Sequence, residues 1–364
     1  MNAYKHLIRP LLFKLNPEAT HAMARALLRC PYSRRLFGGQ GLFIHDERLR
    51  VNLGGLTISN PVGLAAGFDK DCDMVNSLMG LGFGYIVPGS VMYHPRPGNP
   101  CPRIIRDPER EAVYSCMGLP SRGLDYALKQ LGRRRYSNVP LIINLNAENY
   151  DDYLKTFEAL QPFGEALEIT LYCPNRPNDA GDFLSPGVAE RLLVEIVKRK
   201  KKPVFIKIPG YRSENERRKR LNLVEHILKF PVEGITITPE SLVDEGRLSI
   251  GRGTVTGRPM FRQTLSVVRD VYRLTKDKWH IRASGGIFTS VDAFEAITAG
   301  ASTVDIFTGF IYEGWCIARN INQGLLNLMK KFSIENVTAL RGAELKIGTR
   351  LHGNGGESLI GAKQ

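Results

Sequence analysis

The sequence has few cysteines, and they are scattered. The six lie at positions 30, 72, 101, 116, 173 and 316, with no CxxC pair and no repeated spacing. Disulfide frameworks and zinc sites need paired spacings, so the pattern argues against both and favours a reducing cytoplasm. An HExxH motif and clustered carboxylates are also missing, so we expect no metal.

Long hydrophobic runs are missing as well. No stretch reaches the roughly 18 apolar residues of a membrane-spanning helix. Charged residues interrupt residues 3–28 throughout, so we expect no secretory signal. The 364 residues are 43% hydrophobic and 24% charged, which is typical of a soluble protein with a large core.

Basic residues outnumber acidic ones, with a net charge of +14. They gather in three runs, at residues 133–135, 198–202 and 217–220. Such runs are usually solvated helix faces, although an anionic membrane surface or nucleic acid is an alternative partner. We expect no nucleic-acid partner, for reasons given below.

Residues 1–40 form a separate segment of two short amphipathic helices. Apolar residues recur at helical spacing in the first: Leu7, Ile8, Leu11, Leu12 and Leu15. Asn16, Pro17 and Glu18 then provide an N-cap, a first-turn proline and a first-turn acid for the second helix. The helices could pack on the protein, or residues 1–35 could make a peripheral contact with the inner face of the cell membrane.

Eight short apolar runs alternate with helical segments across residues 41–343. They are 61–66, 83–89, 140–145, 166–171, 203–208, 233–237, 279–284 and 302–308. Continuous apolar runs are typical of parallel strands buried on both faces. Eight such units predict an α/β fold, a (β/α)₈ TIM barrel, after the two-helix extension. A hairpin is expected around Gly54–Gly55 and a flexible tail over residues 344–364.

Polar residues and glycines gather where these runs end. Ser284–Gly286 and Thr308–Gly309 follow the last two runs. The loops after strands seven and eight of a TIM barrel often hold a phosphate, and glycine lets backbone N–H groups approach it. Lys70 and Lys207 lie at two other strand ends and would suit negative charge on a reduced flavin ring.

Together these strand ends resemble those of the dihydroorotate dehydrogenases, flavoproteins that carry FMN in the mouth of such a barrel. The resemblance runs from about residue 4 to residue 343. It rests on NPVGLAAGFDKD (60–71), GSVMYHPRPGNPCPRIIR (89–106), YCPNRP (172–177), VFIKI (204–208), TGRP (256–259), ASGGI (283–287) and AGASTVDIFTGFIYEG (299–314). Residues 6–28 further resemble the membrane-associated, quinone-reducing class, whose two helices form a hydrophobic entrance toward the flavin.

The resemblance implies an FMN-dependent oxidoreductase that acts on CH–CH bonds. The implied cofactor residues are Ala65, Ala66, Gly67, Lys70, Ser90, Asn144, Lys207, Thr238, Thr256, Gly257, Ser284, Gly285, Gly286, Thr308 and Gly309. Of these, Ser90 replaces a threonine of similar chemistry.

The resemblance is weaker on the substrate side. The family surrounds its substrate with asparagines, and only Asn175 remains here. The implied substrate residues are Ser115, Cys116, Met117, Ser121, Thr170, Asn175 and Pro239. A buried polar group left unpaired costs about 1–3 kcal/mol. Several such losses predict a substrate other than dihydroorotate, unless other substitutions compensate.

Cys173 follows the fourth run and is the implied catalytic acid/base. The quinone-linked class usually has serine at this position, and the soluble class has cysteine. A thiol acts as a base near neutral pH when a cationic neighbour lowers its pKa. Cys173 would take a proton from one substrate carbon while a hydride leaves the neighbouring carbon for N5 of the flavin.

Three functions remain open. The first is an FMN oxidoreductase of a small cyclic polar substrate other than dihydroorotate, with a quinone reoxidising the flavin. The second is a genuine quinone-dependent dihydroorotate dehydrogenase of pyrimidine biosynthesis, and the third is a non-catalytic flavin-binding protein. Flavoenzymes that reduce tRNA also use a cysteine, but the N-terminal extension and the lack of an added RNA-binding domain speak against that activity.

Overall fold

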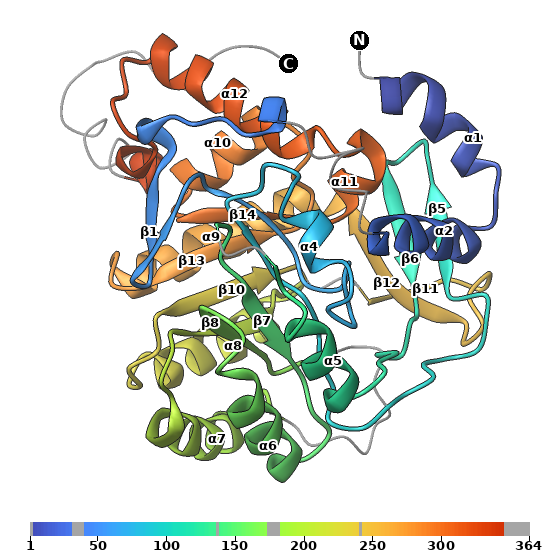
Figure 1. Cartoon of the computed structure of the whole chain (residues 1–364). Coiled ribbons are helices and arrows are strands. Elements are labelled where there is room, and N and C mark those ends of the chain that lie inside the picture. Colours follow the sequence, from blue (N-terminus) through green and yellow to red (C-terminus); the bar gives the residue numbers. More distant parts are fainter. Residues whose placement is uncertain (1–2, 31–39, 136–137, 173–182, 240–241, 346–364) are drawn as a thin grey trace.

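An eight-stranded parallel barrel forms the centre of the molecule, and it confirms the eight predicted runs (Figure 1). The computed structural model describes residues 3–30, 40–135, 138–172, 183–239 and 242–345. The barrel strands are β3 (Val62–Leu64), β4 (Tyr85–Ile86), β7 (Ile142–Leu145), β8 (Ala166–Thr170), β9 (Val204–Pro209), β10 (Gly234–Thr238), β13 (His280–Ser284) and β14 (Thr303–Ile306). They pair in the order β4-β3-β14-β13-β10-β9-β8-β7, and a bridge between Ile86 and Leu141 joins the two ends.

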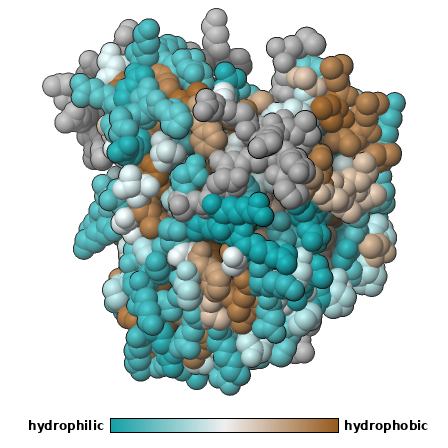
Figure 2. All heavy atoms as spheres, in the orientation of Figure 1, coloured by the Kyte–Doolittle hydropathy of each residue, from teal (hydrophilic) through white to brown (hydrophobic). Residues whose placement is uncertain are grey.

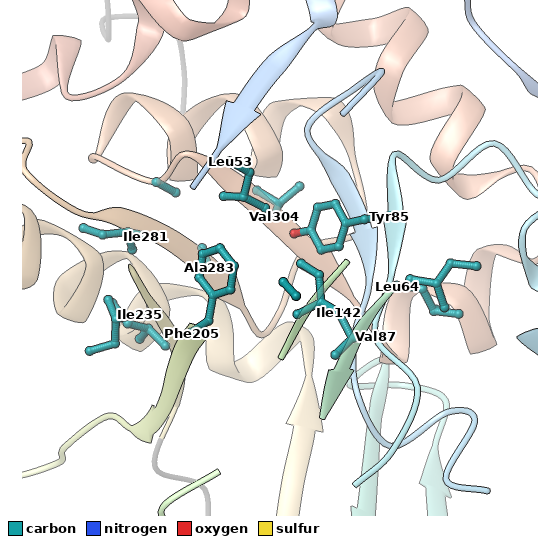
Figure 3. Close-up of a cluster of buried hydrophobic side chains, with 14 of the residues drawn as sticks. Leu53, Leu64, Tyr85, Val87, Ile142, Phe205, Ile235, Ile281, Ala283 and Val304 are labelled. Carbon is teal, nitrogen blue, oxygen red and sulfur yellow. The ribbon is translucent and has the colours of Figure 1, made fainter. Parts of the chain in front are cut away.

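Helices surround the barrel. They are α4 (Val75–Leu78), α5 (Leu124–Leu131), α6 (Tyr150–Leu160), α7 (Pro186–Arg199), α8 (Glu214–Ile227), α9 (Phe261–Thr275), α10 (Ser290–Thr298), α11 (Thr308–Glu313) and α12 (Ile317–Lys331). Most barrel-strand residues are buried, as continuous apolar runs require. Figure 3 shows part of the resulting core, to which Leu64, Phe205, Ile235 and Val304 contribute from four different strands.

The predicted hairpin consists of β1 (Val51–Leu53) and β2 (Leu56–Ile58). Gly54 has a φ of +61°, a conformation that favours glycine. A Cβ atom at Gly54 would lie 2.7 Å from the Cβ of Glu233, so the turn rests on the segment that leads into β10. Leu53 and Ile58 are fully buried. The hairpin therefore covers the amino ends of the barrel strands and leaves their carboxyl ends open.

A second, antiparallel sheet was not predicted from the sequence. Its order is β11 (Leu242–Asp244), β12 (Arg252–Gly257), β6 (Ala112–Ser115) and β5 (Ile104–Asp107). The two central strands pair across about 140 residues of sequence, with Ser115 opposite Thr254. Figure 1 shows this sheet beside α2 (Pro17–Arg29).

The N-terminal helices follow the prediction with one difference. Asn16 caps α2, and its side-chain oxygen accepts hydrogen bonds from the N–H groups of Glu18 and Ala19. The first helix is divided into a π-helical turn, Tyr4–Ile8, and α1 (Arg9–Phe13). Pro10 accounts for the division, because it lacks an N–H group and its ring crowds the carbonyl group four residues earlier.

Ion pairs hold the inner side of α2 on the barrel, while its outer side is apolar. Arg25 contacts Asp71 at 2.5 Å and Asp73 at 2.6 Å, and Glu18 contacts Arg103 at 2.6 Å. The large exposed apolar side chains of this segment are Leu7, Ile8, Leu11, Leu15, Met23 and Leu27. Figure 2 shows a hydrophobic cluster at the upper right, where Figure 1 places α1. Among the described residues, no helix combines the length and apolar character needed to cross a membrane.

Candidate active site

A cavity of about 290 Å³ lies at the carboxyl ends of the barrel strands. All eight barrel strands contribute to its wall, and β6 and β12 of the antiparallel sheet cover one side. All but one of the expected cofactor residues lie on this wall: Ala65, Ala66, Gly67, Lys70, Ser90, Lys207, Thr238, Thr256, Gly257, Ser284, Gly285, Gly286, Thr308 and Gly309. The exception is Asn144, which is buried directly behind the wall residue Thr170.

Glycine is required at the end of β13. Gly285 and Gly286 have φ values of +126° and +75°. A Cβ atom would lie 2.6 Å from Cδ of Pro239 at the first position and 2.5 Å from the backbone nitrogen of Phe261 at the second. A larger residue would clash with Pro239 or Phe261, so the turn needs glycine, and a glycine turn on the cavity wall suits a phosphate group.

Two lysines bring positive charge to the wall. The Nζ of Lys70 donates a hydrogen bond to the carbonyl oxygen of Gly67 at 2.6 Å. Burial lowers the pKa of Lys70 from 10.5 to about 8, so most molecules carry the ammonium form at pH 7. The Nζ of Lys207 lies 3.9 Å from a carboxylate oxygen of Glu168. Positive charge on this wall would favour negative charge on a ligand in the cavity.

These features fit FMN. The glycine turns suit its phosphate and the lysines suit the charge of its reduced ring. The Oδ1 atom of Asn144 is buried and has no hydrogen-bond partner among the described residues, so it could accept from an N–H group of the ring. FMN would supply the hydride-accepting chemistry, and these residues would bind and orient it.

Four of the expected substrate residues lie on the cavity wall: Ser115, Met117, Thr170 and Pro239. Ser115 and Thr254 face each other across β6 and β12, with their hydroxyl oxygens 3.3 Å apart. Thr254 was not predicted from the sequence, because its place on the wall depends on the antiparallel sheet.

Asn146 is a further wall residue that sequence reasoning missed. It follows β7 and is fully buried, and its Oδ1 accepts a hydrogen bond from the Tyr153 hydroxyl at 3.2 Å. Its Nδ2 has no partner in the described part of the chain. The only signal in the sequence was an amide two residues after Asn144. The site thus has a buried amide donor at a position that the resemblance did not imply.

Two expected substrate residues lie away from the wall. Cys116 is fully buried in a separate apolar cluster with Leu248 and Val255. The Ser121 hydroxyl accepts a hydrogen bond from the N–H of Gly123, which precedes α5. For Cys116 the reason is that Ser115, Met117 and Leu119 on alternate positions line the cavity, which turns Cys116 toward the apolar cluster. Cys173 and Asn175 lie outside the described residues.

Three charged residues inside the barrel were also missed. Arg282 on β13 is fully buried and contacts Glu168 on β8 and Asp305 on β14, each at 2.7 Å. Asp305 also lies on the cavity wall. The signal in the sequence was a single charge inside each of three apolar runs, where a continuous apolar strand has none.

His21 on α2 packs against the residues that follow β3. Its ring meets Phe68 edge-on, with 6.4 Å between the ring centroids. Burial, together with the charges of Lys70 and Arg25, lowers the pKa of His21 from 6.5 to about 4. His21 is therefore neutral at pH 7 in the folded protein.

We expect the folded protein to lose stability through His21 as the pH falls from about 6.5 to about 4. Over this range the unfolded chain binds a proton at residue 21 that the folded chain does not, so unfolding becomes more favourable at lower pH. Between pH 7 and pH 5, the unfolding free energy of the wild type should fall by about 2 kcal/mol more than that of His21→Gln. Equal losses in both proteins would contradict the assignment.

Comparison with known proteins matches most of the chain to one sequence family. Residues 48–329 match the family described as dihydroorotate dehydrogenase. A dihydroorotate dehydrogenase (quinone) from Roseiflexus castenholzii is 34% identical over 363 residues, covering 93% of this chain and 96% of the relative. Another from Thermus thermophilus is 33% identical, covering 91% and 99%.

Solved structures agree with the sequence match. The crystal structure of DHODH from Eimeria tenella in complex with ferulenol superposes with a TM-score of 0.80 and 26% identity, covering 93% of this chain and 99% of that one. The ligand-free structure of the same enzyme gives a TM-score of 0.80 and 27% identity, with 90% and 99% covered. The predicted resemblance and the predicted TIM barrel are confirmed.

Proposed function

The chain belongs to the dihydroorotate dehydrogenase family, and from that premise we propose that it oxidises a CH–CH bond of a small cyclic polar substrate and passes the electrons through FMN to a quinone. It is an FMN-dependent oxidoreductase of the quinone-linked class, as the relatives indicate. The observation that carries the proposal is the similarity over nine-tenths of the chain, joined to a cavity whose wall suits a flavin phosphate.

Dihydroorotate is the first candidate substrate. The relatives compared are named for it, and they lend no support to the different substrate that the altered pocket predicted. The lost asparagines also have replacements nearby. Asn146 offers an unpartnered amide Nδ2, and Ser115, Thr170 and Thr254 place hydroxyl groups on the same wall. These groups could pair with the polar edges of a ring that asparagines bind elsewhere in the family.

A changed substrate is the second candidate, and one observation favours it. Pro239 stands on the wall with no side-chain donor or acceptor, and two other wall residues, Met117 and Leu119, are apolar. A substrate ring with fewer polar groups on that side would leave none of its atoms unpaired. The chemistry would be the same.

The N-terminal segment is the proposed site at which the quinone, the electron acceptor, enters. Residues 1–40 would form the quinone entrance as a unit separate from the barrel of residues 41–343. The apolar outer face of α1 and α2 would rest on the inner face of the cell membrane, where quinones reside. Binding to anionic lipid vesicles, lost on removal of residues 1–30, would test this contact.

Anaerobic reduction of the purified flavoprotein tests the substrate proposal. We expect dihydroorotate to bleach the FMN absorbance with saturable kinetics, and a quinone analogue to restore it. Bleaching by other cyclic amides but not by dihydroorotate would select the second candidate. FMN that binds but is bleached by none of these reductants would indicate a non-catalytic flavin-binding protein instead.

A further inference from the structure

The buried charges inside the barrel lie next to the cavity. Arg282 donates to Oε2 of Glu168 and to Oδ2 of Asp305, each at 2.7 Å, and all three side chains are almost entirely removed from solvent. Buried ion pairs contribute little net stability, because the loss of hydration offsets their attraction. A stabilising role alone therefore does not account for the cluster.

Glu168 uses its two carboxylate oxygens on different partners. Oε2 accepts hydrogen bonds from Arg282 and from the Thr236 hydroxyl. Oε1 accepts from Nδ2 of Asn144 at 2.5 Å and lies 3.9 Å from Nζ of Lys207. Although burial disfavours the charge, Arg282 and Lys207 lower the pKa of Glu168. Glu168 is therefore a carboxylate at neutral pH, and it can only accept hydrogen bonds.

A partner that only accepts decides which way the Asn144 amide faces. Nδ2 must point toward Glu168, and the same nitrogen donates its second hydrogen to Oγ1 of Thr170 at 2.7 Å. Oδ1 is thereby turned from both partners, and it is buried without a hydrogen-bond partner among the described residues.

The direction of these hydrogen bonds also determines what the cavity wall offers to a ligand. The Thr170 hydroxyl accepts from Asn144 and keeps its own hydrogen for another acceptor. Thr170 lines the cavity, and so does Lys207, the cation beside Oε1 of Glu168. The carboxylate thus acts on the cavity through both side chains.

We propose that Glu168 is a positioning residue that determines which groups of Asn144 and Thr170 donate hydrogen bonds to a ligand in the cavity and which accept them. It holds Asn144 behind the wall residue Thr170 with the Asn144 carbonyl oxygen unpartnered, so a ligand meets one donor, the Thr170 hydroxyl, and has one acceptor behind it, the Asn144 carbonyl oxygen. This pattern selects ligands that present an N–H group beside a carbonyl group, as cyclic amides and the flavin ring do. The inference rests on the proposed FMN cofactor.

Glu168→Gln tests the inference in the FMN-loaded protein. A neutral amide at this position accepts or donates, so Asn144 is no longer held in one orientation. We expect the dissociation constant of FMN to rise about tenfold, which corresponds to about one hydrogen bond. The midpoint potential of the flavin should shift to a more positive value, because removing a nearby negative charge favours the added electrons.

Thr236→Val is the matched control. It removes one hydrogen bond from the same carboxylate, on the side away from Asn144, and keeps the charge. The control should bind FMN as the wild type does, with the same potential. Equal effects of Glu168→Gln and Thr236→Val on both quantities would overturn the inference and leave only a structural role.

Glu168→Asp separates orientation from charge and decides the matter if Glu168→Gln does not fold. The shorter side chain keeps the negative charge near Arg282 and withdraws it from Asn144. We expect weaker FMN binding with an unchanged midpoint potential, and wild-type FMN affinity would overturn the inference. Failure of the wild type itself to bind FMN would instead refute the proposed function.

Discussion

Cys173→Ala is expected to slow the reduction of bound FMN by its substrate about 10²–10⁴-fold, the usual contribution of a general acid/base, and to leave FMN binding unchanged. The reaction breaks two C–H bonds on neighbouring carbons. One hydrogen leaves as a hydride, and the other must leave as a proton to a base. The chain reaches residue 173 directly after the wall residues Thr170 and Tyr172, and Lys70 and Lys207 bring positive charge to the same cavity. Positive charge favours the thiolate form of a cysteine.

Stopped-flow measurement of the reductive half-reaction checks this expectation. Cys173→Ser should recover part of the rate, and only at higher pH, because a hydroxyl group loses its proton less readily than a thiol. Cys316→Ala is the matched control, since Cys316 directly precedes α12 and is not among the residues that line the cavity. A Cys173→Ala enzyme that reduces its flavin at the wild-type rate would remove Cys173 from the reaction.

Arg25→Met is expected to slow reoxidation by a quinone at least tenfold while preserving reduction by the substrate. The Asp73 side chain is 1% exposed, and Arg25 is its closest cation, at 2.6 Å. Removing one member of a fully buried ion pair costs about 3 kcal/mol or more, and the cost is smaller here because the Arg25 side chain is 29% exposed. Arg29 at 3.3 Å and the Tyr126 hydroxyl at 3.1 Å would remain as partners of Asp73. Arg29 is the last residue of α2 and is itself 46% exposed, so α2 keeps only this weaker contact with Asp73, and the loss falls on its attachment.

Separate measurement of the two half-reactions provides the check. Arg48→Met is the matched control. Arg48 contacts Asp46 on an exposed surface through Nε and Nη2, at 2.9 and 2.7 Å, and Arg25 contacts Asp73 through the same two nitrogens. Exposed pairs contribute only about 0–1 kcal/mol, so the control should behave as the wild type. If Arg25→Met slows both half-reactions equally, α2 does not serve the acceptor side specifically.

The barrel could be predicted because its signals are local. Each buried parallel strand is a continuous apolar run, and the eight runs occur in the order that a barrel needs. The N-cap at Asn16 and the glycine turn at Gly54 are equally local, since a few neighbouring residues determine them. The same holds for Ser284–Gly286, which lie on the cavity wall where the strand order predicts.

The missing parts depend on contacts between distant residues. Ser115 and Thr254 come together only through a strand pairing across about 140 residues, which no local pattern specifies. The orientation of the Asn146 amide depends on Tyr153 in the following helix, whose hydroxyl donates a hydrogen bond to the amide oxygen. Glu168 and Arg282 are 114 residues apart in the sequence. Each is a single charge in an otherwise apolar strand, and a single charge does not indicate its partner.

The pairing of β3 with β14 also determines how late in synthesis the first barrel strand gains its second neighbour. The first barrel strand ends at residue 64, and its second neighbour begins at residue 303. At roughly 5–20 residues per second, a ribosome needs on the order of tens of seconds to supply that neighbour. Until then one edge of an apolar strand stays open to other chains, a condition that invites aggregation. The glycines that follow β13 and β14 on the cavity wall, Gly285, Gly286 and Gly309, leave the ribosome late as well, so FMN could stabilise the nascent protein only after residue 309 has been made.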